Sequence, residues 1–417
     1  MRPPAADPLA DALAEAHRRE WAFVLAATVR VTGDLDLAEE CAQEAYVAAL
    51  EAWREHGVPD RPGAWLTTTA RRKALDRLRR ESTLRRKLPL LIEPAGHGEI
   101  NDTAGEQTVP DDRLRLVFTC CHPALSADTQ VALTLRLVCG VETPDVARAF
   151  LVPEPTMAAR ITRAKKKITQ AGIPYRVPGR AELPDRLDSV LSAVHLLFST
   201  GHTAPAGDQL VRSELCERSI HLARTLVTLL PDQPEARGLL GLLLLTDARR
   251  ATRTDAAGRL LLLHEQDRAR WDQRAIGEGL RYAAEALAVR RPGRYALQAA
   301  IAGVHAVAPS AELTDWPRIL ALYDALLAVW PSPVVALNRV VAVSFVTGPA
   351  AALAQVAGLQ DEPRLAAYPY LPATRADLLR RLGRYAEAAD AYAAARELTH
   401  NTAEREFLER REKEMRG

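Results

Sequence analysis

The sequence has little of what marks a secreted, disulfide-bonded or membrane-spanning protein. Its five cysteines in 417 residues fall at irregular spacing, which provides no disulfide framework and suits a reducing compartment. The longest leucine-rich run, residues 238–245, is far shorter than the roughly 20 apolar residues that span a bilayer. The first residues also lack the apolar core of a signal peptide. We therefore expect a cytoplasmic protein with no contact with a membrane.

Signatures of catalysis are missing as well. The sequence contains no phosphate-binding glycine loop, nucleophile elbow or dinucleotide fingerprint. The Cys-Cys-His triplet at residues 120–122 invites a metal hypothesis, but adjacent ligands do not suit a tetrahedral zinc site. His195, His221 and His305 lie on apolar faces of expected helices, where core packing is the simpler interpretation. We expect no enzyme, no metal and no cofactor.

The composition instead indicates an all-α protein. Alanine, leucine, arginine and glutamate dominate, and aromatic residues make up 5% of the chain. Apolar residues such as Trp21, Leu25 and Val29 recur at helical spacing. The pattern predicts helices over about 8–85, a breaker-rich linker at 86–110, a second helical unit at 111–172 and a helical remainder at 183–417.

The helical remainder shows a weak internal repeat. Residues 375–401 resemble a tetratricopeptide unit, with Gly383 between two helices followed by Ala388, Ala389 and Tyr392. Gly348 has a similar setting 35 residues earlier. A period near ~34 residues predicts stacked helical hairpins, each of which buries a face that its neighbour supplies.

Charge is informative in its distribution. The net charge is only +2, but residues 71–87 contain nine basic and two acidic side chains, and residues 160–167 contain five basic and no acidic ones. Two local concentrations of positive charge on otherwise neutral domains favour an anionic partner such as nucleic acid.

The second basic segment ends a predicted helix–turn–helix at residues 143–168. The first helix begins near Thr143 with Pro144 in its first turn, and the VPEP sequence breaks the chain before the second helix. An apolar stripe would anchor the second helix, formed by Met157, Ile161, Ala164 and Ile168. A polar stripe beside it is formed by Thr156, Arg160, Arg163 and Lys167.

A helix of this kind fits the major groove of DNA, where its first residues read base edges and its basic end contacts phosphates. The residues expected near bases are Glu154, Thr156, Ala159 and Arg160. Those expected at phosphates are Arg163, Lys165, Lys166 and Lys167. The alternative is that the lysine triplet is only a solvated helix end.

The first basic segment has a different character. The sequence WLTTTARRKALDRLRR, residues 65–80, combines a tryptophan, three threonines and dense arginine. This mixture suits a track along a DNA backbone with stacking on separated bases. The alternative is a basic amphipathic helix that packs through Leu66, Ala70 and Leu78.

Together these segments resemble a known family. Residues 8–172 are similar to the extracytoplasmic-function sigma factors, which are bacterial promoter-recognition subunits of RNA polymerase with only region 2 and region 4. The motif DLAEECAQEAYVAALEAW resembles the region-2 helix that binds the polymerase clamp, the segment WLTTTARRKALDRLRR resembles the helix that melts and reads the −10 element, and the helix–turn–helix resembles the part of region 4 that reads the −35 element.

The resemblance implies two further sets of site residues. Those for polymerase binding are Glu39, Glu40, Gln43 and Glu44. Those for the −10 element are Trp65, Thr68, Arg71, Arg72, Asp76, Arg79 and Arg80. Arg72 departs from the asparagine usual in the family, so backbone binding at this position is better supported than base recognition.

The rest of the chain resembles the subgroup with a C-terminal tetratricopeptide-like extension. The motifs that carry this likeness are HLLF at 195–198, EQDRARWD at 265–272, RPGRYALQAAIAGVHA at 291–306 and LNRVVAV at 337–343. EQDRARWD and RPGRY could line a groove or form inter-helix salt bridges. After residue 198 the chain reads STGHTAPAG, where relatives usually continue with Asn-Glu-Gly-Tyr.

The resemblance thus implies an all-α fold made of a region-2 bundle, a region-4 helix–turn–helix and a helical-hairpin extension. It implies core RNA polymerase and promoter DNA as partners, with an intramolecular contact between the extension and the sigma domains that modulates activity. The alternatives are a DNA-binding regulator with a helical-repeat scaffold that acts without polymerase and, more remotely, an enzyme with a helical active-site domain.

Overall fold

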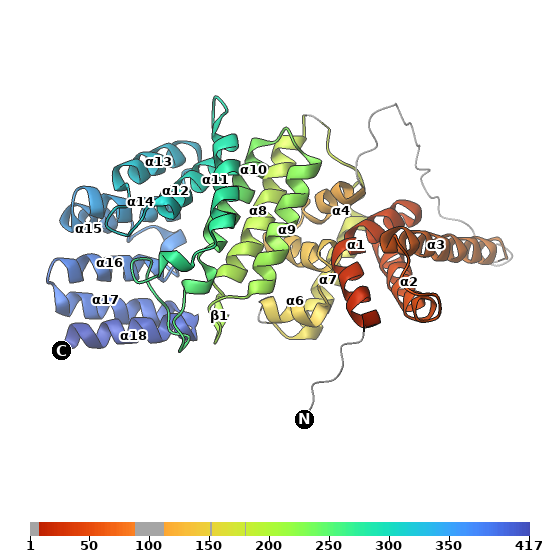
Figure 1. The fold of residues 1–417 in the computed structure, drawn as a ribbon, viewed down its shortest axis with the longest axis horizontal. Coiled ribbons are helices and arrows are strands. Elements are labelled where there is room, and N and C mark those ends of the chain that lie inside the picture. The colour runs from red at the N-terminus through yellow and green to blue at the C-terminus, as the bar shows by residue number, and fades with distance from the viewer. Residues whose placement is uncertain (1–7, 88–111, 151, 180) are drawn as a thin grey trace. The chain divides into compact units, whose positions relative to one another are not determined.

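The computed structural model describes residues 8–87, 112–150, 152–179 and 181–417. Helices dominate these residues, which confirms the predicted all-α class (Figure 1). The exceptions among the described residues are two short strands, β1 (Ala206–Gly207) and β2 (His400–Asn401), and an isolated bridge. The chain divides into two compact units, Met1–Ala193 and Val194–Gly417.

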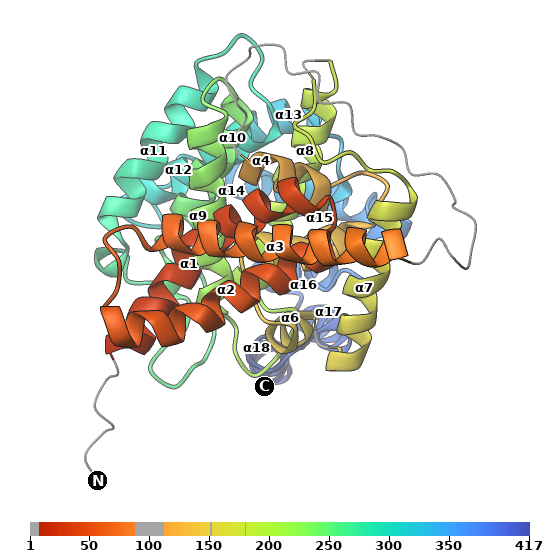
Figure 2. The same ribbon diagram turned by 90° about the vertical axis from the view of Figure 1, so that its right-hand side faces the viewer.

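The first unit begins with a three-helix bundle of α1 (Pro8–Thr32), α2 (Leu35–His56) and α3 (Pro62–Lys87), in which each helix packs on the other two (Figure 2). Asp34 caps α2 by accepting a hydrogen bond from the backbone N–H of Leu37 at 2.8 Å. The predicted core residues Trp21, Leu25 and Val29 are all buried. The bundle therefore forms from the helical spacing that the sequence shows.

A second helical group completes this unit. It contains α4 (Asp112–Cys120), α5 (Ala127–Leu133), the π-helical turn η2 (Thr134–Val138), α6 (Thr143–Phe150) and α7 (Glu154–Gln170). Gly140 ends the stretch from α5 through η2 in the left-handed region, at φ 66°. Most of the linker predicted at 86–110, from residue 88 onward, lies outside the described residues.

The second unit is a succession of helical hairpins. Its helices are α8 (Leu183–His202), which begins in the first unit, and then α9 (Ser213–Leu229), α10 (Pro234–Asp247), α11 (Gln273–Leu287), α12 (Arg294–Val307), α13 (Trp316–Val329), α14 (Pro333–Val346), α15 (Pro349–Ala357), α16 (Tyr370–Arg381), α17 (Tyr385–Leu398) and α18 (Thr402–Arg416). Three 3₁₀ turns connect them, η3 (Arg250–Thr252), η4 (Arg268–Arg270) and η5 (Pro363–Leu365). Helices that follow each other pack side by side, as α13 with α14 and α16 with α17.

The predicted hairpin at residues 375–401 is present as α16 and α17. Gly383 turns the chain between them at φ 75°, and Ala388, Ala389 and Tyr392 are buried. The two ends of the second unit are tied together, because β1 pairs in parallel with β2. The side-chain amide of Asn401 also donates to the carbonyl oxygens of Ala204 and Gln209, at 3.2 and 3.0 Å.

The two polar motifs of the second unit have structural tasks. In EQDRARWD, Arg268 donates to the carbonyl oxygens of His305 and Ala308 at 2.7 and 2.8 Å, and Asp272 caps α11. Glu265 of the same motif, in the turn before η4, lies 3.8 Å from Arg411 of α18, so one ion pair joins this turn to a helix. Next to RPGRY, the carboxylate of Glu235 accepts from the first backbone N–H groups of α12. Backbone capping thus outweighs the salt bridges that the sequence suggested.

None of the helices within the described residues is long and apolar enough to cross a membrane. The leucine-rich run at residues 238–245 lies in α10, which packs against α9, α11 and α12. It is apolar because these three helices cover it. Its close contacts depend on small residues, since a Cβ atom on Gly238 would lie 2.6 Å from the backbone nitrogen of Ala296.

We predict that Gly238→Ala destabilises the second unit by about 1–3 kcal/mol, because α10 and α12 must move apart to admit the methyl group. The matched control is Gly277→Ala on α11, where an added Cβ meets nothing within 4 Å. That change should be neutral or stabilising by up to about 1 kcal/mol, since alanine favours a helix. Urea unfolding of the full chain, followed by circular dichroism, compares the two. Equal midpoints would contradict the close packing of α10 on α12.

Candidate nucleic-acid interface

The helix α7 is anchored by one face, as the sequence predicts. Its apolar stripe is buried, formed by Met157, Ile161, Ala164 and Ile168. The preceding helix α6 buries Val146 and Ala149. Since α6 and α7 pack together, the opposite face of α7 is held toward solvent on a rigid support.

That outer face contains most of the residues predicted for the −35 element. Those that are exposed are Glu154, Thr156, Ala159, Arg163, Lys166 and Lys167. Arg160 is half-buried, and its guanidinium lies 5.7 Å from the ring centre of Phe150. A cation resting on an aromatic ring has fewer conformations to lose on binding. The face therefore presents an ordered row of hydrogen-bond donors.

Lys165 differs from its neighbours, because its side chain is 9% exposed and points into the first unit. Its Nζ lies 2.5 Å from Glu39 Oε2 and 2.7 Å from Asp36 Oδ1. Burial lowers the pKa of Lys165, but the two carboxylates outweigh it and the net shift is upward. Lys165 is thus a charged, buried group that cannot reach DNA in this arrangement.

The helix α3 presents a second polar face. The −10 candidates that are exposed on it are Thr68, Arg71, Arg72, Asp76, Arg79 and Arg80. Trp65 is half-buried, with its ring edge-on to Trp53 at 5.8 Å between centroids. The opposite face buries Leu66 and Ala70, with Leu78 partly covered. The amphipathic packing is therefore present, and the exposed arginines leave the expected track along DNA as a prediction.

The residues expected to bind polymerase lie on α2. Glu40 and Gln43 are exposed, and Glu44 is half-buried. Arg77 of α3 bridges Glu40 and Glu44, at 3.0 and 2.5 Å. Burial raises the pKa of Glu44, yet hydrogen bonds from Arg77 and Lys73 shift it downward overall. Both carboxylates are therefore held in place by α3.

Two apolar residues extend this surface, and the sequence reasoning missed them. Val47 is 59% exposed and Leu50 is 39% exposed. With Glu40 and Gln43 they follow each other at spacings of three and four residues, which places all four on one stripe of α2. They could have been found as apolar positions that fall outside the packing stripe of Ala42, Tyr46, Ala49 and Trp53. An exposed stripe that mixes acidic and apolar groups is typical of a protein-binding surface.

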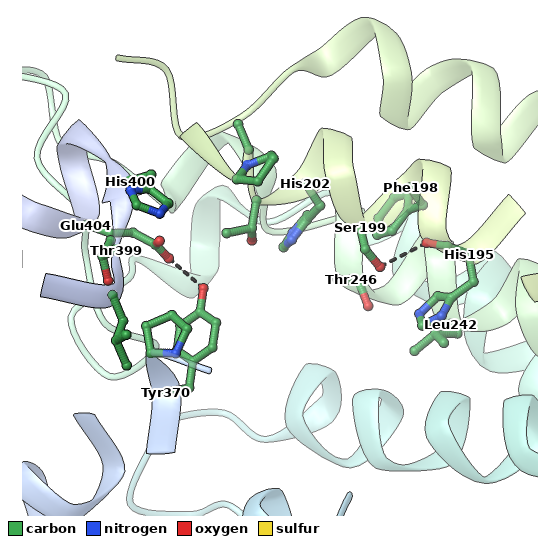
Figure 3. A pocket seen from close by; sticks show the side chains of 15 residues that line it. His195, Phe198, Ser199, His202, Leu242, Thr246, Tyr370, Thr399, His400 and Glu404 are labelled. Carbon is green, nitrogen blue, oxygen red and sulfur yellow. Dashed lines mark hydrogen bonds between the residues drawn. The ribbon is translucent and has the colours of Figure 1, made fainter. Parts of the chain in front are cut away.

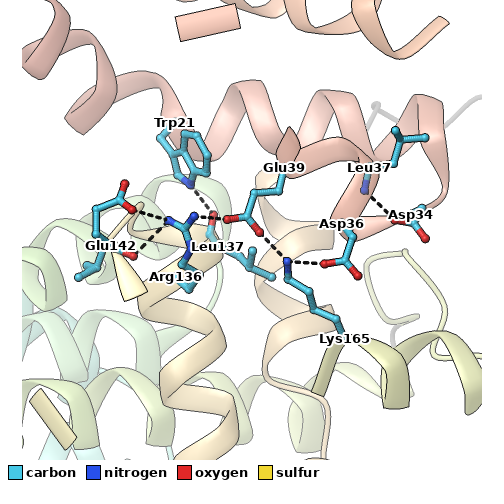
Figure 4. A network of polar contacts seen from close by, with 10 residues as sticks. Trp21, Asp34, Asp36, Leu37, Glu39, Arg136, Leu137, Glu142 and Lys165 are labelled. Carbon is cyan, nitrogen blue, oxygen red and sulfur yellow. Dashed lines mark hydrogen bonds and ion pairs between the residues drawn. The ribbon is translucent and has the colours of Figure 1, made fainter. Parts of the chain in front are cut away.

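Glu39 is the one polymerase candidate that is buried, and it joins the two helical groups of the first unit (Figure 4). One carboxylate oxygen is paired with Arg136 of η2, and the other accepts from Lys165 of α7. The indole N–H of Trp21 on α1 donates to the carbonyl oxygen of Leu137 at 3.0 Å. We call these residues, Trp21, Glu39, Arg136, Leu137 and Lys165, the clasp.

The other chemical candidates have structural roles. Within the described residues no group of three histidine, cysteine or acidic side chains could hold a metal ion. Cys120 and Cys121 are buried, and burial raises the pKa of Cys121 to about 11. His195 and His305 are largely covered, and burial lowers the pKa of each to about 4. The core interpretation is wrong for His221, which lies on the outer side of α9 and is exposed.

Three family models match the chain. The model of sigma-70 region 2 matches residues 15–83, and that of sigma-70 region 4 matches residues 115–168. A family of unknown function, DUF6596, matches residues 186–287. The first two cover the helices that carry the exposed basic faces and the clasp.

Relatives agree with these matches. The uncharacterized protein R00370 of Rhizobium meliloti (strain 1021) is 43% identical over 387 residues, which are 92% of this chain and 91% of that protein. The probable ECF RNA polymerase sigma factor SigI of Mycobacterium tuberculosis (strain ATCC 25618 / H37Rv) is 28% identical over 39% of this chain and 56% of its own length. The ECF RNA polymerase sigma factor SigK of Mycobacterium sp. (strain KMS) is 28% identical over 36% of this chain and 78% of its own length. No solved structure matches.

Both sigma regions are thus present with their exposed basic helices, and a relative matches nearly the whole length of the chain, including its helical second unit. The chain belongs to the extracytoplasmic-function sigma factors of RNA polymerase, in the form that carries a C-terminal helical extension.

Proposed function

We propose that this sigma factor directs promoter-specific initiation by using α2 for core polymerase, α3 for the −10 element and α7 for the −35 element. It acts in the cytoplasm as a non-enzymatic initiation factor. The observation that carries the proposal is that each of the three helices buries one face and exposes a face of distinct chemistry. The exposed face is acidic and apolar on α2, arginine-rich on α3 and donor-rich on α7.

At the −35 element, the N-terminal part of α7 enters the major groove. Thr156 and Ala159 are small and exposed there, and Arg160 lies one turn after Thr156. A guanidinium suits the two acceptors on a guanine edge, whereas Lys166 and Lys167 provide charge for phosphates. Arg160 therefore determines base preference, and the lysines determine affinity.

At the −10 element, α3 follows the separated strand. Arg71, Arg72, Arg79 and Arg80 are exposed along it, and Trp65 offers a partly open aromatic ring. Arginine at position 72 strengthens backbone contact at a position where the family usually has asparagine. Stacking and charge thus hold the melted strand here, with less reading of bases at this position.

At the polymerase, the stripe of Glu40, Gln43, Val47 and Leu50 forms the docking surface. Two exposed aliphatic residues on a soluble helix lose contact with water when a partner covers them. A regulator that acts without polymerase has no use for this surface, and the match to sigma-70 region 2 favours the sigma factor over that alternative.

The clasp must open before α3 and α7 can bind the −10 and −35 elements at the same time. Promoter elements two helical turns apart are separated by roughly 70 Å, since one turn spans about 34 Å. In the structure, α7 is held against α2 by Lys165 and Glu39. We infer that the clasp keeps the free protein inactive and that the C-terminal extension modulates how readily it opens.

We predict that Val47→Glu weakens binding to core polymerase at least about tenfold, which corresponds to roughly 1.4 kcal/mol. The change buries a charge at the interface without touching the core, since Val47 is exposed. The control is Val307→Glu, an equally exposed valine (58%) of the extension. Fluorescence anisotropy with labelled core polymerase compares the two. Unchanged affinity of Val47→Glu would remove this stripe from the interface.

We predict that Arg160→Ala lowers discrimination at one position of the −35 element by about 1–3 kcal/mol. The control is Lys166→Ala, which should weaken binding to all promoters equally because it removes a phosphate contact. Initiation by reconstituted polymerase is measured on promoters selected from a randomised library and on single-base variants of them. A uniform loss with Arg160→Ala would make it a phosphate contact instead.

We predict that Arg136→Met opens the clasp and tightens binding to core polymerase. Arg136 is 6% exposed and lies outside the predicted polymerase and DNA contacts. Removing one partner of a buried ion pair costs about 3–5 kcal/mol, which the closed state alone loses. The control is Arg176→Met, whose partner Glu182 lies six residues away on the surface. Hydrogen exchange of α7 should rise in Arg136→Met alone. Unchanged exchange and affinity would show that the clasp does not limit activity.

A further inference from the structure

The extension contains a cavity of about 450 Å³ within the residues Val194–Gly417. This volume lies within the roughly 300–1,000 Å³ of small-molecule sites. Its lining comes from the end of α8, from α10, from the start of α16 and from the segment that joins α17 to α18. Much of one wall is built by residues 199–205, which belong to the segment that departs from the pattern of relatives.

His202 lies in the middle of this cavity, between Phe198 on one side and Tyr370 on the other (Figure 3). It is 7% exposed. The imidazole hydrogen-bonds to the backbone of Thr246, but its Nε2 atom has no partner among the described residues. A buried polar atom without a partner costs about 1–3 kcal/mol, so its presence here needs a reason.

The protonation state of His202 determines what Nε2 can bind. Burial, together with Arg253 and Arg249, lowers its pKa to about 2. The ring is therefore neutral at physiological pH. The hydrogen bond to the backbone of Thr246 favours the charged form of the ring, which means that the ring is the donor in this bond. Since the other nitrogen carries the proton, Nε2 offers a lone pair. It accepts a hydrogen bond from whatever enters the cavity.

A second acceptor lies on the opposite wall. Tyr370 donates its hydroxyl proton to Glu404 Oε1 at 2.6 Å (Figure 3). Glu404 is positioned at the start of α18, where Asn401 Oδ1 accepts from its backbone N–H at 3.3 Å. The carboxylate keeps acceptor capacity beyond the tyrosine bond. Phe198, Leu242 and Leu398 give the lining its larger apolar side chains.

The charges around the cavity exclude ions. Arg253 is anchored on the carbonyl oxygen of His202 and on the Thr203 hydroxyl, and it interacts with the charge of Glu404. Arg253 lies outside the lining, but its positive charge offsets that of Glu404, so a cation gains little net attraction there. An anion would meet the Glu404 carboxylate, and neutral His202 could not donate to it. The cavity thus favours an uncharged molecule with two hydrogen-bond donors and a C–H face that packs on the apolar part of the lining.

We propose that this cavity binds a small uncharged polyhydroxylated molecule of the sugar or polyol class, with one hydroxyl donating to His202 Nε2 and another to Glu404. The aromatic and aliphatic lining packs against its C–H face. Such a molecule contacts both ends of the extension, because β1 and β2 already bring residues 206 and 400 together beside it. Binding therefore stabilises the pairing of β1 with β2.

The experiment titrates the full-length protein with D-glucose and myo-inositol in a calorimeter, and separately with putrescine and inorganic phosphate. We expect one or both polyols to bind and the two ions not to bind. His202→Leu should weaken polyol binding at least about tenfold, equivalent to roughly 1.4 kcal/mol. The matched control is His305→Leu, because His305 is also a covered neutral histidine with an unpartnered nitrogen but does not line the cavity.

Glu404→Gln provides a second variant that keeps the shape of the side chain, and circular dichroism checks that each variant is folded. Glu404→Gln should weaken polyol binding, whereas His305→Leu should not. Polyol binding that survives both His202→Leu and Glu404→Gln overturns the site. Preferential binding of putrescine or phosphate overturns the ligand class, and the absence of binding by every probe overturns the proposal. None of these outcomes depends on whether the protein initiates transcription.

Discussion

A single carboxylate shared by two cations holds the sigma domains together. Glu39 on α2 accepts from Arg136 and Lys165, and all three side chains are less than a tenth exposed. Charges so far from water are tolerated only when each has a partner, because several kcal/mol of hydration are lost for each ion. The pairing therefore requires α2, η2 and α7 to remain in register, and the contact of Trp21 with Leu137 adds to it.

The clasp uses two residues that the sequence predicts to bind other partners. Glu39 belongs to the helix expected to dock on polymerase, and Lys165 belongs to the basic end of the helix expected to recognise DNA. When each is the other's partner, neither can meet its target. Water can solvate both charges once the groups separate, so opening costs less than removing one partner. This makes the pair suitable for a two-state element whose balance a partner can shift.

Much of the fold could be predicted because it depends on local periodicity. The packing stripe of α7, the hairpin around Gly383 and the amphipathic α3 all follow from residues a few positions apart. On the exposed side of α2 the sequence predicted the polar residues but not Val47 and Leu50. These two look like core residues until the packing of α1 and α3 on α2 shows which stripe is covered. His221 was misjudged for the same reason, since an apolar neighbourhood in sequence does not specify the side that a helix turns inward.

The sequence by itself determined the helices, their polar and apolar faces, the two concentrations of positive charge and the family likeness, since each depends on the order of nearby side chains. Tertiary structure alone decided that Lys165 faces inward while Lys166 faces solvent, that Glu39 is a buried anchor, and that His202 shares a cavity with Glu404. Lys165 and Glu39 lie 126 positions apart in the chain, and His202 and Glu404 lie 202 positions apart. Contacts of such range arise from how whole helices pack, which no local pattern records.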